Sequence, residues 1–282
     1  MNGLDEPHLV NLVNPVKNAV SARLRGYGKT AAMAATSVAG ESPIFLLDYA
    51  VRFLRVALLL SVWRIVMARH PVAGGMSLGE VLTYTLVAEL FAEQFACRIG
   101  LEDSLWDGNV ATRFARPMSL VEQFTSETVG KWAVGWVLCS IPLLLAAPLL
   151  GVDPWPASVA AGLLFAVSMV LSVSIGLALE FIMGALLVWF QLSPWSINRT
   201  RDAIAALVSG RVIPLALLPW GLGRAFEWLP FAAAVSAPLR IFIGAGDPLC
   251  LLAVQAAWAI GLWPVALWMW RANRQRLAGY GG

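Results

Sequence analysis

The sequence predicts an all-α polytopic membrane protein, because its composition is strongly apolar and its apolar residues form runs long enough to cross a bilayer. Of the 282 residues, 59% are hydrophobic and only 13% are charged. A soluble globular domain has about 45–50% apolar and about 25% charged residues. Too few charges are available to cover a water-exposed surface of this size, whereas lipid removes that requirement.

Six segments are predicted to be transmembrane helices, since about 20 mainly apolar residues cross a bilayer. Five qualify readily: 78–98, 129–150, 157–190, 202–221 and 250–270. A sixth, 45–68, carries four charged residues: Asp48, Arg52, Arg55 and Arg64. Its first turns are expected at the interface, where long arginines reach water. Segment 157–190 would be about 50 Å long against a core of about 30 Å, so it must tilt, kink or project.

Residues 222–249 contain two apolar pieces, each too short to cross the membrane. Pro219, Pro230, Pro238 and several glycines interrupt this part of the chain. One interpretation is an outer loop that lies on the membrane. We favour a re-entrant hairpin of two short helices, which is possible where other helices cover the backbone.

The N-terminal segment is expected to contain a short amphipathic helix. Asn14-Pro15 has the pattern of an N-cap followed by proline in the first helical turn. Apolar residues then recur at helical spacing, with Lys17 and Arg25 on another face. A basic amphipathic helix of this kind lies on the inner membrane surface. A solvated linker is the alternative.

Lysine and arginine predict the orientation. With six spans, both ends of the chain lie on the same side of the membrane. The segments on that side carry most of the basic residues outside the spans, including Arg199 and Arg201 in a predicted loop, 191–201. Basic loops face the cytoplasm. The chain is therefore predicted to comprise a cytoplasmic segment, a transmembrane domain and a cytoplasmic tail: 1–41, 42–272 and 273–282.

Several function classes lack support in the sequence. No GxxxxGK[ST] pattern is present, so no ATPase site, no bound cofactor and no catalytic residue are expected in this chain. His8, His70 and the three cysteines have no metal-ligand spacing, so no metal site is predicted. Gly244–Asp247 matches a GxGD protease pattern, but a turn explains it better. The basic residues form no single stripe, so no nucleic-acid partner is expected.

Charged residues inside the predicted spans indicate ion pairs or a substrate pathway, because they are costly in lipid. Glu89 and Glu93 are four residues apart and share a helix face, and Arg52 and Arg55 in the preceding span are their expected partners. A structural ion pair between neighbouring helices is slightly favoured over a pathway.

Glu180 belongs to a stripe of residues at steps of four with Ser172, Gly176 and Gly184. Small residues at this spacing let another helix pack closely. The Glu180 carboxylate is therefore expected to face protein or water. Two roles remain open for it: a place on a substrate pathway, or a hydrogen bond at a helix contact.

The strongest local signal is the stretch between the second and third spans, Leu101–Leu120. It mixes charges with apolar anchors, which suits a short helix docked on another cytoplasmic protein. Pro117 and Ser119 precede the next span. Just beyond, Glu127 and Lys131 are four residues apart and are expected to pair with each other.

Within this stretch, Gly108-Asn-Val-Ala-Thr-Arg-Phe-Ala-Arg-Pro117 resembles the "G-x-[IV]-x-x-x-L-x-R-P" segment of ABC-2-type transporter permeases. Phe114 stands where leucine is common. Ile213-Pro-Leu, Leu229-Pro-Phe, Pro238 and the terminal Tyr280-Gly-Gly also resemble that family. Each motif is short, and their order along nearly the whole chain carries the resemblance.

The resemblance implies a permease subunit of an ATP-driven exporter in the bacterial cytoplasmic membrane. It implies two permeases, identical or homologous, surrounded by membrane lipid, and two copies of a separate ATPase domain that bind ATP and Mg²⁺. The loop after the second span would contact the ATPase and couple its motion to the spans. The residues expected to do so are Asp107, Gly108, Arg113, Arg116 and Pro117.

Two other classes remain as alternatives. An ion-gradient-driven transporter would use membrane carboxylates such as Glu89, Glu93 and Glu180, and would be expected to show two repeated halves, which the sequence lacks. A membrane subunit that anchors or senses without transporting is the third class.

Overall fold

A computed structural model describes residues 25–37, 44–69, 72–113 and 116–273. The regular secondary structure of the described chain is helical, apart from a small antiparallel hairpin of β1 (Val72–Ala73) and β2 (Met76–Ser77). Residues 25–37 are helical. The start of the expected amphipathic helix at Asn14-Pro15 lies outside the described residues, and so does the tail from residue 274 onward.

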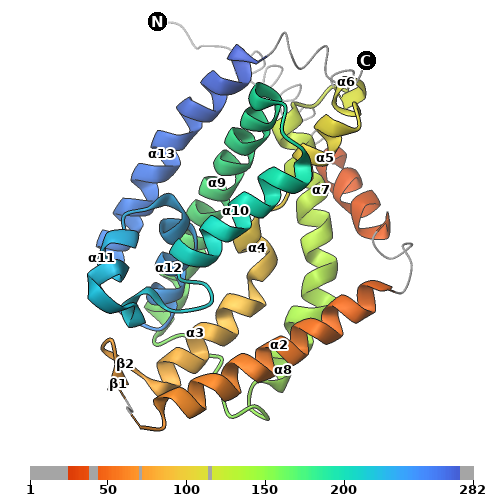
Figure 1. Ribbon diagram of the computed structural model, residues 1–282. Coiled ribbons are helices and arrows are strands. Elements are labelled where there is room, and N and C mark those ends of the chain that lie inside the picture. Colours follow the sequence, from red (N-terminus) through yellow and green to blue (C-terminus); the bar gives the residue numbers. More distant parts are fainter. Residues whose placement is uncertain (1–24, 38–43, 70–71, 114–115, 274–282) are drawn as a thin grey trace, which may run out of the picture.

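The helices form a bundle with the β1–β2 hairpin at one end and α5 and α6 at the other (Figure 1). They are α2 (Ile44–Met67), α3 (Leu78–Leu90), α4 (Ala92–Ala96), α5 (Leu101–Trp106), α6 (Val110–Arg113), α7 (Leu120–Gly135), α8 (Ile141–Ala146), α9 (Val159–Phe190), α10 (Pro194–Val208), α11 (Leu222–Phe226), α12 (Pro230–Phe242) and α13 (Pro248–Ala272). A π-helical turn, Trp136–Ser140, joins α7 to α8, and two 3₁₀ turns, Leu215–Leu217 and Pro219–Gly221, precede α11.

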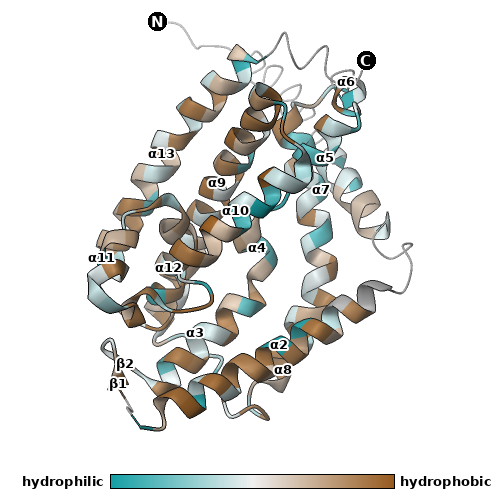
Figure 2. Ribbon diagram, in the orientation of Figure 1, coloured by the Kyte–Doolittle hydropathy of each residue, from teal (hydrophilic) through white to brown (hydrophobic). Residues whose placement is uncertain are grey.

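The long helix α9 is the centre of the packing, with α12 and α13 against it and α10 lying obliquely across it (Figure 1). Apolar residues extend along the long helices, and hydrophilic residues gather around α5, α6 and α10 (Figure 2). Within the described chain, three helical stretches are long and apolar enough to cross a membrane: Leu120–Ala146, Val159–Phe190 and Pro248–Ala272.

Several helix boundaries coincide with the expected spans, since α2, α9 and α13 cover nearly the segments 45–68, 157–190 and 250–270. The segment 78–98 differs, because Phe91 leaves helical geometry and divides it into α3 and α4. The helix expected over 129–150 begins earlier, at Leu120, where Ser119 and Glu122 form a capping box. The π-helical turn precedes Pro142, which has no N–H to donate to the helix.

The helix expected over 202–221 requires correction. Helix α10 begins at Pro194, capped by the Ser193 hydroxyl, and ends at Val208. Gly210 then adopts a positive φ of 75°, and Pro214 follows. Hydropathy placed the start too late, because the arginines of 191–201 indicated a loop. The cap and the prolines are the stronger boundary signals.

The region 222–249 forms the expected pair of short helices, α11 and α12. Helix α12 is buried along most of its length and contacts α9 and α13. Gln255 of α13 donates a hydrogen bond of 2.9 Å to the Ala233 carbonyl, and the Ser172 hydroxyl of α9 donates to the Ala234 carbonyl. The Ala234 carbonyl needs this bond, because its usual helical partner at residue 238 is a proline without an N–H.

Two glycines of α9 allow close approach of the chain around α5. A Cβ at Gly176 would lie 2.6 Å from the Cys97 Cβ, and one at Gly184 would lie 2.8 Å from Leu101 Cδ2. With Ser172 and Glu180, they form the stripe expected from the sequence, and it faces protein rather than lipid.

We predict that Gly176→Val lowers the thermal unfolding temperature of the detergent-solubilised protein by several degrees, because an added side chain overpacks this contact by about 1–3 kcal/mol. Gly261→Val is the matched control, since Gly261 is an exposed position of α13 and a Cβ there would have no neighbour within 4 Å. Equal unfolding temperatures for the two variants would show that the α9 contact is not close-packed.

Candidate functional site

The segment between α4 and α7, which contains α5 and α6, forms a compact cap on one end of the bundle. Leu101, Leu105 and Val110 are buried in an apolar cluster with side chains of α7, α9, α10 and α13. Gly100 and Gly108 both have φ of 70°, a conformation that glycine adopts without strain, and they allow the turns before and after α5. The cap is therefore anchored by its apolar side chains.

The outer surface of this cap is exposed and polar, with one large aromatic residue. Trp106 is 53% exposed. The side chains of Asp107, Asn109, Arg116 and Pro117 are also exposed, and Gly108 is partly exposed. An exposed tryptophan among polar side chains is typical of a protein contact surface.

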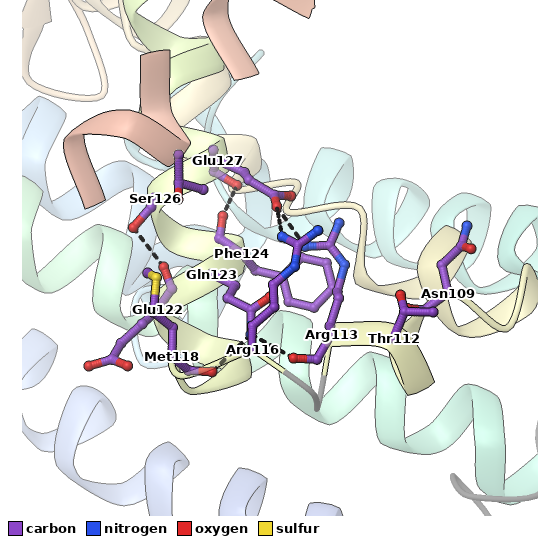
Figure 3. A network of polar contacts seen from close by, with 12 residues as sticks. Asn109, Thr112, Arg113, Arg116, Met118, Glu122, Gln123, Phe124, Ser126 and Glu127 are labelled. Carbon is purple, nitrogen blue, oxygen red and sulfur yellow. Dashed lines mark hydrogen bonds and ion pairs between the residues drawn. The ribbon is translucent and has the colours of Figure 1, made fainter. Parts of the chain in front are cut away.

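A polar network fixes α6 to the first turns of α7 (Figure 3). Arg113 Nη1 lies 2.7 Å from Glu127 Oε1, and its guanidinium lies 4.4 Å from the centre of the Phe124 ring. Arg116 lies 3.9 Å from the same carboxylate. The buried Gln123 amide donates to the carbonyls of Arg113 and Met118, at 2.9 and 2.8 Å. The expected Glu127–Lys131 pair is corrected: Glu127 instead binds the arginines of the cap.

The start of α7 also binds the N-terminal helical segment. Ser119 and Glu122 bond reciprocally as a capping box, and the Tyr27 hydroxyl donates a hydrogen bond of 2.7 Å to Glu122. Gly130 faces the Ala31 backbone so closely that a side chain at residue 130 would not fit. Residues 25–37 therefore pack against the helix that follows the cap.

At its base the cap lies beside α10. Glu102 of α5 is 3% exposed, and burial raises the pKa of its carboxyl, against the attraction of Arg201 and Arg98. Arg201 donates to the Ala96 carbonyl and forms an ion pair with Glu180 of α9. The sequence analysis placed Arg201 in a predicted loop, 191–201, yet the residue lies in α10 and is 6% exposed. The signal that Arg201 belongs to a helix was the pair Ser193-Pro194, which caps and begins α10 shortly before it.

A second charge cluster joins α2 to α3 and α4. Arg52 lies 3.0 Å from Glu93, and Arg55 contacts Glu89, as the sequence suggested. Arg211, in the segment after α10, lies 3.5 Å from Glu89. This contact was not anticipated, because Arg211 falls within the span expected over 202–221 and was assigned no partner. Each of these carboxylates therefore faces at least one arginine from another segment.

The charged groups of the cap and the bundle are arranged as ion pairs between separate segments. In the part of the chain that the structure describes, no group of three His, Cys, Asp or Glu side chains could hold a metal ion. The exposed cap is connected through ion pairs to α7 and α10, which run into the bundle.

A family model described as ABC-2 family transporter protein matches residues 53–281. The chain belongs to the ABC-2 transporter family. No curated protein matches it. Family membership and the long apolar helices together identify a multi-pass membrane protein. In this ABC-2 transporter, the segment with the motif Gly108–Pro117 is the cap formed by α5 and α6.

We predict that Arg113→Gln loosens the cap of the ABC-2 transporter, because it removes the closer ion pair to Glu127 and the contact with Phe124. Amide hydrogen exchange in 101–113 should rise at least about fivefold. Arg116→Gln is the control, since an exposed arginine at 3.9 Å contributes little. Faster exchange in Arg116→Gln than in Arg113→Gln would contradict this account.

Proposed function

We propose that the chain is the permease subunit of an ATP-driven ABC exporter, powered by a separate ATPase and paired with a second permease, identical or homologous. The observation that carries the proposal is the cap of α5 and α6, an exposed surface around Trp106 braced against membrane helices by Arg113 and Glu127. A surface that receives mechanical input needs such bracing, because a loose loop would absorb the motion.

In the proposed orientation the cap and both termini are cytoplasmic, and the β1–β2 hairpin lies on the outer side of a bacterial inner membrane. The C-terminal end of α13 and the start of α7 lie at the same end of the bundle as the cap (Figure 1), which supports this assignment. Six membrane passages and a re-entrant α11–α12 pair are part of the same proposal, and the burial of α12 under neighbouring helices supports it.

The proposed mechanism begins when ATP and Mg²⁺ close a pair of ATPase domains. Their movement shifts the cap through Asp107, Gly108, Arg116 and Pro117. Arg113 and Glu127 pass the shift to α7. Separation of the two permeases then opens a path to the outer side. The exposed apolar face of α2 offers a surface for lipid or for the second permease.

An ion-gradient mechanism receives less support from the side chains. Glu89, Glu93 and Glu180 each face an arginine. Each pair joins side chains of separate helices: α2 with α3 and α4, and α10 with α9. These carboxylates are therefore placed to hold neighbouring helices together.

The test is co-expression with an ABC-type ATPase encoded beside this chain, followed by affinity purification and measurement of ATP hydrolysis and export from vesicles. Trp106→Ala should weaken ATPase association by about tenfold or more, because exposed aromatic residues often dominate protein contacts. Trp220→Ala is the matched control, since Trp220 is 92% exposed and lies away from the cap. Both variants should unfold at the wild-type temperature.

Failure to purify any ATPase with the wild-type chain would refute the proposed assembly. Full association and coupled export in Trp106→Ala, Arg116→Glu and the wild type would instead remove the cap from the coupling mechanism.

A further inference from the structure

A cavity of about 310 Å³ lies among α9, α10, α12 and the end of α4. One part of its wall is apolar, formed by Phe95, Leu179, Phe231 and Val235, among others. The volume is near the lower limit of ligand pockets, roughly 300–1,000 Å³. The cavity therefore suits a compact group attached to an apolar body.

Three arginines from separate segments line the same cavity. Arg98 follows α4, Arg201 lies in α10, and Arg211 follows α10. Asp202, which pairs with Arg98, is the one carboxylate among the described lining residues. A lining with three guanidinium groups and one carboxylate is unusual inside an apolar bundle, because burying charged groups there is costly.

The carboxylates that pair with Arg201 and Arg211 do not line the cavity. Glu180 pairs with Arg201, and Glu89 lies 3.5 Å from Arg211, but neither carboxylate is part of the lining. These pairs offset the net charge, so charge alone would give weak selection of a ligand. Recognition must depend on directed hydrogen bonds from the guanidinium groups.

A donor group is available for such bonds. Arg211 Nε is buried, and no described residue accepts a hydrogen bond from it. Arg201 Nη1, by contrast, contacts Glu180 Oε1 in their ion pair, so Arg211 carries the open donor. A buried donor without an acceptor is unfavourable, and an oxygen supplied by a ligand would relieve that cost.

We propose that this cavity binds the phosphate or carboxylate group of an amphipathic molecule, which is the cargo of the transporter. Guanidinium groups bind these oxyanions through paired N–H donors. The apolar side chains cover the beginning of the hydrocarbon body. The assignment of the ligand as cargo rests on the proposed transport function, whereas the binding site itself does not.

The test uses the full chain alone, in nanodiscs of phosphatidylcholine, with dodecyl phosphate as the probe. Dodecyl phosphate should bind saturably to one site, and dodecyltrimethylammonium should not. Arg211→Gln should weaken binding by about tenfold or more, because it removes charge-assisted hydrogen bonds. Arg98→Gln is a second lining variant with a half-exposed side chain, and it should weaken binding by several fold.

Arg55→Gln is the matched control. Arg55 and Arg211 contact the same Glu89 carboxylate, so either variant leaves Glu89 with one arginine, but only Arg211 lines the cavity. Arg55→Gln should retain binding within about twofold. Equal weakening by both variants, equal binding of the two probes, or uptake that never saturates would overturn the proposal.

A further arm identifies the natural source of the oxyanion. Addition of phosphatidylglycerol to the nanodiscs should either displace dodecyl phosphate, which identifies a membrane lipid as the occupant, or leave its affinity unchanged, which indicates a free amphiphile. Both results support an oxyanion site. Absence of an ATPase partner would refute the proposed exporter and leave this binding result intact, so the two failures are distinguishable.

Discussion

The compensation of buried carboxylates is the constraint on which much of the arrangement depends. Glu89 and Glu180 are almost fully buried in the bundle, where an uncompensated charge would cost several kcal/mol. Arg55 of α2 and Arg211 compensate Glu89, and Arg201 of α10 compensates Glu180. The positions of α2 and α10 are therefore set by where their guanidinium groups must lie, as well as by apolar contact.

Two modes of attachment coexist in the bundle. Helices α9, α12 and α13 pack closely over most of their length and share an apolar core. In α10, by contrast, Ile197 and Arg201 are the buried residues, and its other contacts with the bundle include the Arg98–Asp202 pair. Close-packed apolar contacts resist displacement. Helix α10 is therefore held by directed polar contacts, among them the buried Arg201–Glu180 pair, whereas α12 is held mainly by apolar packing.

Much of the fold was predictable from hydropathy, but the functional details depended on weaker signals. Apolar runs located α2, α9 and α13, and the Gly108–Pro117 motif located the cap. The α10 boundaries were missed, because a helix rich in polar residues resembles a loop until its cap and prolines are considered. The pairing of Glu127 was missed for a different reason. Arg113 belongs to another helix, α6, and approaches Glu127 only because α6 folds against α7.

Arg201 connects the cap to the cavity. It lies in the lining of the cavity, and its charge acts on Glu102 at the base of the cap. A ligand oxyanion in the cavity would act on Arg201, which already contacts Glu180 and the Ala96 carbonyl. Thermodynamic linkage is reciprocal, so a cap position that favours ligand binding is in turn favoured by the ligand. In the proposed exporter, Arg201 would therefore be the residue through which cargo in the cavity and the position of the cap influence each other.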